Sequence, residues 1–198
     1  MILQNNMCNI KISVDETYTI DSADNKTYDL VINSQHLKHS DIYRAFSIEI
    51  DLFYKTLRIA LIGDFYSYAD DSLGYDANCA ILEEEVLTVL QNHTVVQIDV
   101  NNGAVLLFKE VDCFGCNYGI YKVKNGYVIY GEIQITMLDF DFNKKWSFMG
   151  KNVFKSRTGK KPFELCGNFI RLYDFDDNFY EIDFMGNLIT EGVNQDVE

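Results

Sequence analysis

The sequence predicts an all-β protein built from antiparallel, four-stranded, blade-like repeats. Runs of four to eight residues rich in Tyr, Phe, Val, Ile and Thr alternate with clusters of Asn, Asp and Gly, which is the pattern of short strands separated by turns. Helical spacing of apolar residues is scarce. A short motif also recurs at intervals of 35 to 40 residues, and periods of about that length are typical of propeller blades.

The composition is that of a folded globular chain. Of its 198 residues, 47% are hydrophobic and 14% are aromatic, and a chain of this size buries roughly 70% of its unfolded surface. We expect a single all-β domain over 1–198, with a less regular part over 1–76, propeller-like repeats over 77–190 and an acidic tail over 191–198. Because the first residues lack a signal-peptide pattern and no run of 18 apolar residues occurs, we expect a cytoplasmic protein.

The alternating pattern places strands along the whole chain. The expected ranges are 10–14, 18–21, 27–32, 45–53, 57–63, 78–82, 86–90, 94–100, 104–109, 118–124, 127–132, 135–141, 145–149, 163–166, 169–174, 178–184 and 187–190. Asn102-Gly103 and Asn125-Gly126 supply the positive φ angles of tight hairpins. One short helix is expected around 34–44, where Ser40 and Asp41 can cap a turn or two.

The recurring motif is apolar-x-x-apolar-Asp-apolar followed by a turn. It places Asp99, Asp139 and Asp174 at equivalent positions, and a half-size echo places Asp183 nine residues after Asp174. An Asp at the end of a strand accepts hydrogen bonds from the backbone of the next turn, so the motif needs no chemistry to explain it. The chain is too short for six to eight blades, and we therefore expect a partial or small propeller, or a stacked β-meander.

A family resemblance rests on three stretches, 96–103, 126–132 and 138–148. With them, residues about 77–190 resemble the repeats of the bacterial quinoprotein-like (PQQ-type) β-propeller superfamily. In such repeats a Trp of the last strand packs between blades; Trp146 fits that place, and Phe108 and Tyr180 stand at comparable positions. The quinone and calcium ligands of that superfamily's enzymes have no counterparts here, so the resemblance implies an architecture and no cofactor.

The charge predicts the kind of partner. Seventeen Lys and Arg stand against 30 Asp and Glu, a net charge of −13. Such a surface repels nucleic-acid phosphates and anionic membranes, and it attracts basic proteins by electrostatic steering. We expect a basic protein as partner, with no nucleic acid and no membrane. The chain is similar in this respect to small acidic bacterial proteins that act as immunity partners of toxins. The alternative is that the charge only maintains solubility.

The two signs of charge occur in separate blocks. No Lys or Arg lies in 59–108, which holds eight acidic residues, whereas 144–161 holds seven basic residues and no acidic one. One interpretation places the basic block beside acidic strands, where cross-strand pairs form. The other is that an acidic loop presents carboxylates to a cationic partner, as nuclease inhibitors mimic phosphate.

The loop over 63–79 is the predicted contact region, because it mixes Asp with Tyr and Phe. Tyrosine in an exposed loop gives a large contact area at a small entropic cost. The alternative is that these rings pack the loop onto the sheet. The predicted protein-binding residues are Asp64, Tyr66, Tyr68, Asp70, Asp71, Tyr75, Asp76, Glu83, Glu84 and Glu85.

No motif of the sequence matches a known metal, redox or phosphate-binding site completely. Cys113 and Cys116 form a CxxC, but it lacks the second ligand pair of a zinc site and the βαβ context of a redox site. We expect packing cysteines, with a metal or redox role as the alternative. His36 and His39 could join such a site only if folding brought them near it.

Two Asp-rich loops, 139–143 and 174–178, lack the turn Gly and the bidentate carboxylate of a calcium loop. Residues 158–161 do not complete a phosphate-binding loop. No catalytic residue, metal ligand or cofactor is predicted. We therefore expect a non-enzymatic protein-binding domain, and its most concrete version is an immunity-type inhibitor of a basic toxin. The alternative is a small enzyme or a sugar- or metal-binding propeller-like module.

Overall fold

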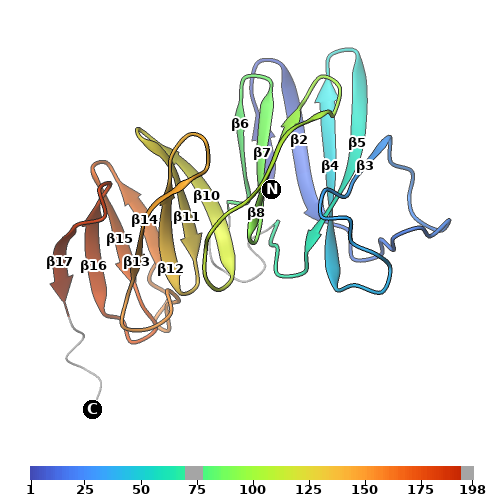
Figure 1. Cartoon of the computed structure of the whole chain (residues 1–198). Helices are drawn as coiled ribbons and strands as arrows, with labels where there is room; N and C mark the ends of the chain where they lie inside the picture. Colours follow the sequence, from blue (N-terminus) through green and yellow to red (C-terminus); the bar gives the residue numbers. More distant parts are fainter. Residues whose placement is uncertain (70–77, 193–198) are drawn as a thin grey trace.

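The computed structural model describes residues 1–69 and 78–192, and these residues form four β-sheets that stand in a row (Figure 1). The described residues contain no helix. No segment among them could therefore cross a membrane as a helix. The predicted fold class, all-β with antiparallel four-stranded blade-like repeats, is confirmed.

The first sheet has five strands in the order β1-β2-β4-β5-β3. Their bounds are β1 (Ile2–Gln4), β2 (Cys8–Val14), β3 (Leu30–Ile32), β4 (Tyr43–Leu52) and β5 (Lys55–Asp64). All neighbours pair antiparallel except β3 and β5, which pair parallel. This crossover distinguishes the first sheet from the three that follow it.

The second, third and fourth sheets are four-stranded meanders in which each strand pairs with the next along the chain. The second sheet comprises β6 (Ala80–Glu83), β7 (Val86–Gln91), β8 (Thr94–Asp99) and β9 (Val105–Glu110). The third comprises β10 (Asn117–Val123), β11 (Gly126–Gly131), β12 (Gln134–Leu138) and β13 (Lys144–Met149). The fourth comprises β14 (Phe163–Cys166), β15 (Phe169–Tyr173), β16 (Phe179–Asp183) and β17 (Leu188–Gly192).

Two local predictions are wrong, and both concern the segment between β2 and the start of β4. Residues 18–21 are β-rich in composition, but they form a turn in which Asp21 has a φ of 63°. The Asn25 amide oxygen accepts from the Thr19 N–H, and the Tyr43 hydroxyl accepts from the Ile20 N–H. Because side chains satisfy this backbone, no strand partner is needed.

The helix expected over 34–44 is also absent. Asn33 braces the first part of this segment, since its side chain accepts from the Leu37 N–H and donates to the Leu37 carbonyl. Asp41 accepts from the Lys38 N–H, so it closes a turn. Asn and Asp side chains that bond to nearby backbone in this way compete with helix formation.

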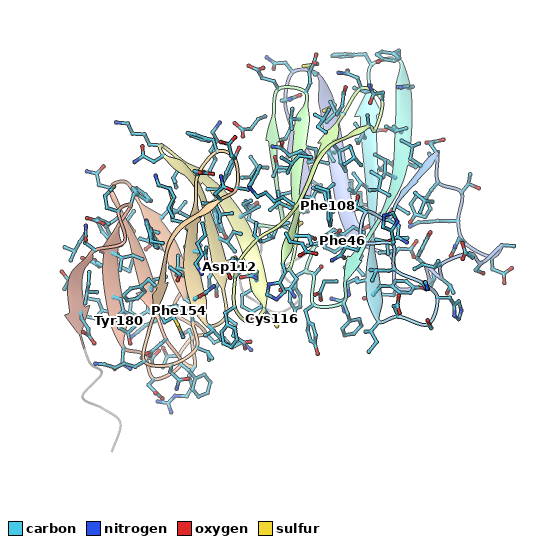
Figure 2. All side chains as sticks on the ribbon, viewed as in Figure 1. Phe46, Phe108, Asp112, Cys116, Phe154 and Tyr180 are labelled. Atoms are coloured by element: carbon cyan, nitrogen blue, oxygen red, sulfur yellow. The ribbon has the colours of Figure 1, made fainter. Side chains whose placement is uncertain are left out.

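A separate hydrophobic core lies between each pair of neighbouring sheets. The first core joins β2, β4 and β5 to β7 and β8, the second joins β7 and β8 to the third sheet, and the last joins the third sheet to the fourth. β11 is buried throughout, because Tyr127 and Ile129 face the second sheet while Val128 and Tyr130 face the fourth. Phe154 and Tyr180 lie in the last core (Figure 2).

The first strands of neighbouring sheets lie next to one another. β6 is close to β1, and β10 is close to β6 and β7. Trp146, on β13, packs into the core between the third and fourth sheets, as the resemblance implies, and its indole N–H donates to the Phe184 carbonyl at 3.2 Å. Gly186, with φ of 88°, leaves room for this ring, since a Cβ there would stand 2.9 Å from it.

The recurring Asp residues cap hairpin turns. The Asp139 carboxylate accepts from the Asn143 N–H at 2.8 Å and from the Asp141 N–H at 2.9 Å. Asp99 and Asp183 also accept from the backbone of their own turns, and all three stand at the end of the third strand of a sheet. These hydrogen bonds lower the pKa values of Asp139 and Asp183 below the usual 3.8, with the bonds from Asn143 and Asn187 as the largest causes.

The repeat predicted from Asp174 is wrong in register. Asp174 follows β15, the second strand of its sheet, whereas Asp183 is the last residue of the third strand, β16. The equivalent residues are therefore Asp99, Asp139 and Asp183, which are 40 residues (99 to 139) and 44 residues (139 to 183) apart. Asp174 is fully buried and accepts hydrogen bonds from the Asn178 amide and the Tyr180 hydroxyl.

Candidate protein-binding surface

Three hairpin turns of the first and second sheets lie together at the top of Figure 1. They are the β1–β2 turn over 5–7, the β4–β5 turn over 53–54 and the β6–β7 turn over 84–85. We call these residues the upper edge. Asn5 connects two of the turns: its Oδ1 accepts from the Met7 and Cys8 N–H groups, and its Nδ2 donates to the Glu84 carbonyl at 2.8 Å. The positions of the turns are thus fixed by hydrogen bonds across two sheets.

A pocket of about 440 Å³ lies between the β1–β2 and β6–β7 turns, and we call it the acidic pocket. Its lining residues are Asn5, Asn6, Met7, Glu84 and Glu85. Both glutamates are exposed, and among the described residues no Lys or Arg forms an ion pair with either. The pocket therefore carries two uncompensated carboxylates.

A second pocket of about 220 Å³ adjoins the acidic pocket, and we call it the aromatic pocket. Its lining residues are Gln4, Asn5, Asn6, Met7, Cys8, Asn9, Asp51, Leu52 and Phe53. The Phe53 side chain is 91% exposed, and the neighbouring Tyr54 is 72% exposed. The two pockets share Asn5, Asn6 and Met7 of the β1–β2 turn, and we call the two pockets together the upper groove.

Glu83 precedes these two glutamates, but its carboxylate binds other residues of the protein. Lys122, on β10, pairs with its carboxylate, and the Tyr127 hydroxyl donates to it at 3.2 Å. Burial and the neighbouring Glu83 charge raise the pKa of Tyr127 to about 12. Glu83 therefore joins the second sheet to the third.

Asp64, Tyr66 and Tyr68 lie at the opposite end of the sheets from Glu84. β5 begins at the upper edge and ends at Asp64 after 10 residues, and at about 3.3 Å per step this separates its ends by roughly 30 Å. The structure therefore does not bring the two groups of predicted residues together. The remaining predicted residues, Asp70, Asp71, Tyr75 and Asp76, lie outside the described residues.

The end of the sheets around Asp64, opposite the upper edge, has its own hydrogen bonds and ring contacts. Asp64 accepts from the Tyr66 N–H at 2.7 Å, and Tyr66 is 54% exposed. Tyr68 is half-buried against Tyr118, with the ring centroids 5.4 Å apart, and burial raises its pKa. Arg44 donates to the Ser67 carbonyl and lies under the Phe65 ring. Of the three predicted residues here, Tyr68 packs against the sheets and Tyr66 faces solvent.

The two cysteines of the CxxC motif lie in different cores. Cys113 packs into the core between the second and third sheets, and burial raises its pKa to about 11. Cys116, labelled in Figure 2, packs into the core between the third and fourth sheets, where burial also raises its pKa. No three His, Cys, Asp or Glu side chains of the described ranges gather as metal ligands. These observations favour packing cysteines.

The basic block forms ion pairs with acidic residues elsewhere in the chain. Lys144 contacts Asp112 at 3.2 Å, and Lys155 contacts Glu132 at 2.8 Å. Lys151 pairs with Glu191 on β17. This agrees with the interpretation in which the basic block lies beside acidic segments. Among the described residues Glu84 and Glu85 form no such pair, and neither do Glu16 and Glu110.

Sequence reasoning missed the β1–β2 turn and the Phe53-Tyr54 turn as parts of this surface. A signal for the second was present, because Phe53 ends the predicted strand 45–53 and Tyr54 follows it, where the Asn, Asp or Gly of a turn is usual. No comparable signal marked Asn5 and Met7. Their role depends on pairing between β2 and β4 and on contact with the second sheet.

Comparison with known proteins finds likeness only among solved structures. No family model matches, and no curated protein matches. The WD40 domain of Pan2 from Neurospora crassa is 14% identical, with a TM-score of 0.45 over 64% of this chain and 40% of that one. BamB from Moraxella catarrhalis is 10% identical, with a TM-score of 0.46 over 77% and 47%. The AfRom2 CNH domain is 8% identical, with a TM-score of 0.45 over 78% and 48%. The chain spans half or less of the length of these propeller-type structures.

Proposed function

We propose that this chain is a non-enzymatic protein-binding module that recognises a basic protein through its upper edge. One observation carries the proposal: the acidic pocket presents Glu84 and Glu85 to solvent, and no cation of the described residues pairs with them. A partner that supplies a cationic group would satisfy both carboxylates.

The charge of the whole chain supports this choice. A net charge of −13 creates a negative potential that accelerates the approach of a cationic protein and disfavours acidic ones. Other acidic residues, such as Glu83 and Glu132, already pair with lysines. A carboxylate that is free of an internal partner interacts with an incoming cation without first breaking a contact.

The most specific version of the proposal is an immunity-type inhibitor of a basic toxin. In that version Glu84 and Glu85 stand in for the phosphates that the toxin would bind. Asp64 and the exposed Tyr66 would form a second contact surface at the other end of the sheets, because roughly 30 Å of β5 separates the two sites.

The test is affinity capture with the tagged full chain from an extract of the producing organism, eluted by steps of salt. The Glu84→Gln/Glu85→Gln variant removes the two pocket charges. The matched control is Glu16→Gln/Glu110→Gln, which removes two exposed charges elsewhere. We expect one stoichiometric basic protein that the control retains and the pocket variant loses. Equal capture by both variants would contradict the proposal, as would the absence of any basic partner at low salt.

A further inference from the structure

We infer that the upper groove binds a short extended peptide segment of the partner that carries a cationic side chain close to an aromatic one. The cationic side chain enters the acidic pocket, and the aromatic side chain enters the aromatic pocket beside Phe53. This inference rests on the proposed function and adds the chemical class of the ligand.

The lining of the acidic pocket fits a cationic side chain along its length. Lys and Arg carry an apolar stem and a charged head. The pocket offers the flexible, polarizable Met7 for the stem and two carboxylates for the head. Asn5 cannot rearrange freely, since its side chain holds both neighbouring turns. The pocket is therefore largely formed before a ligand arrives.

The aromatic pocket is independent evidence for a ligand. Phe53 and Tyr54 form the apex of the β4–β5 hairpin, with Leu52 paired to Lys55 on either side. Such a position usually takes Asn, Asp or Gly, and a Phe that is 91% exposed buries little surface in the fold. Exposed aromatic rings are enriched where proteins contact other proteins.

The two pockets are close enough for one short segment to fill both. They share Asn5, Asn6 and Met7, so only the β1–β2 turn lies between them. In an extended peptide, side chains two positions apart point the same way and stand about 7 Å from each other. A basic residue two positions from an aromatic residue therefore matches the groove.

The test is a titration of the ¹⁵N-labelled full chain with the tripeptide acetyl-Arg-Gly-Phe-amide, followed by amide chemical shifts. We expect shifts at residues 5–7, 52–54 and 84–85, with a dissociation constant in the millimolar range. Acetyl-Glu-Gly-Phe-amide should bind about tenfold more weakly, and acetyl-Arg-Gly-Ala-amide several-fold more weakly. The Phe53→Ala variant should abolish the difference between the Phe and Ala peptides while it retains the difference between Arg and Glu.

The inference is overturned if millimolar Arg-Gly-Phe peptide leaves these residues unshifted, shifts a different surface, or binds no better than the Glu peptide. The Glu84→Gln/Glu85→Gln variant supplies a second check, because it should remove the preference for Arg over Glu. Failure of this inference is distinct from failure of the proposed function. A partner captured through Glu84 and Glu85 without peptide binding would leave the function standing and refute the two-pocket recognition.

Discussion

Replacing Glu84 by glycine should make the protein more stable while it weakens binding to a basic partner. Glu84 has a φ of 49°, which is the left-handed region. Its side chain is exposed and forms no ion pair among the described residues, and the hydrogen bond from Asn5 goes to its backbone carbonyl. The substitution therefore removes no hydrogen bond or ion pair of the described residues.

The magnitude follows from two opposing effects on the backbone. A residue with a Cβ loses about 1–2 kcal/mol in the left-handed conformation, and glycine relieves this loss. Glycine also loses roughly 0.5–1 kcal/mol more conformational entropy on folding. The expected net gain is about 0.5–1 kcal/mol in the free energy of unfolding, or roughly 1–4 °C in Tm for a chain of this size.

The assay is urea unfolding of the full chain, followed by fluorescence, together with partner capture. Two variants separate the effects. Glu84→Gln removes the charge and keeps the left-handed side chain, so its stability should change by only a few tenths of a kcal/mol. Glu85 lies outside the left-handed region. The Glu85→Gly variant should therefore lower the free energy of unfolding by roughly 0.5–1 kcal/mol. A Glu84→Gly variant that is less stable than Glu84→Gln would refute the reasoning, and so would unchanged partner binding.

Three further results are expected. Tyr127→Phe removes the hydrogen bond to Glu83 and should lower the free energy of unfolding by about 1 kcal/mol, whereas the control Tyr54→Phe should have no effect in the same urea titration. Asp139 and Asp183 have lowered pKa values in the folded state, so they stabilise the protein above their usual pKa of 3.8 and lose this contribution as pH falls below it. The Asp139→Asn/Asp183→Asn variant should therefore flatten the acid side of the plot of unfolding free energy against pH. An unchanged slope would count against the turn-capping role. Capture of the basic partner should weaken as salt rises, and salt-independent capture would exclude a carboxylate-driven contact.

Much of the fold is predictable from the sequence because its determinants are local. Alternating burial defines most strands, and turns such as the one at Gly126 carry a positive φ that glycine favours. The errors arise where side chains replace sheet pairing. At Ile20 the backbone N–H is satisfied by the Tyr43 hydroxyl, 23 residues away, and composition contains no sign of that contact.

The repeat register failed for a related reason. Asp174 and Asp183 follow the same local pattern, since each ends a strand and caps a turn. Which of them corresponds to Asp139 depends on strand order within the fourth sheet, and both turns have the same local chemistry. Counting strands from the start of a sheet requires knowing where that sheet begins.

The candidate site is predictable only in part. The sequence places Glu83, Glu84 and Glu85 in one acidic turn. It does not show that Lys122 forms an ion pair with Glu83 and with neither of the other two. That division depends on contact between the second and third sheets. The share of the site contributed by Asn5 depends likewise on contact between the first two sheets.

The most direct test of the account is the association rate of the captured basic partner with the full chain, measured across a series of salt concentrations. We predict that Glu84→Gln/Glu85→Gln slows association and flattens its salt dependence, while Glu16→Gln/Glu110→Gln changes both much less. If the two double variants associate alike, the upper edge is not where this protein meets a basic partner.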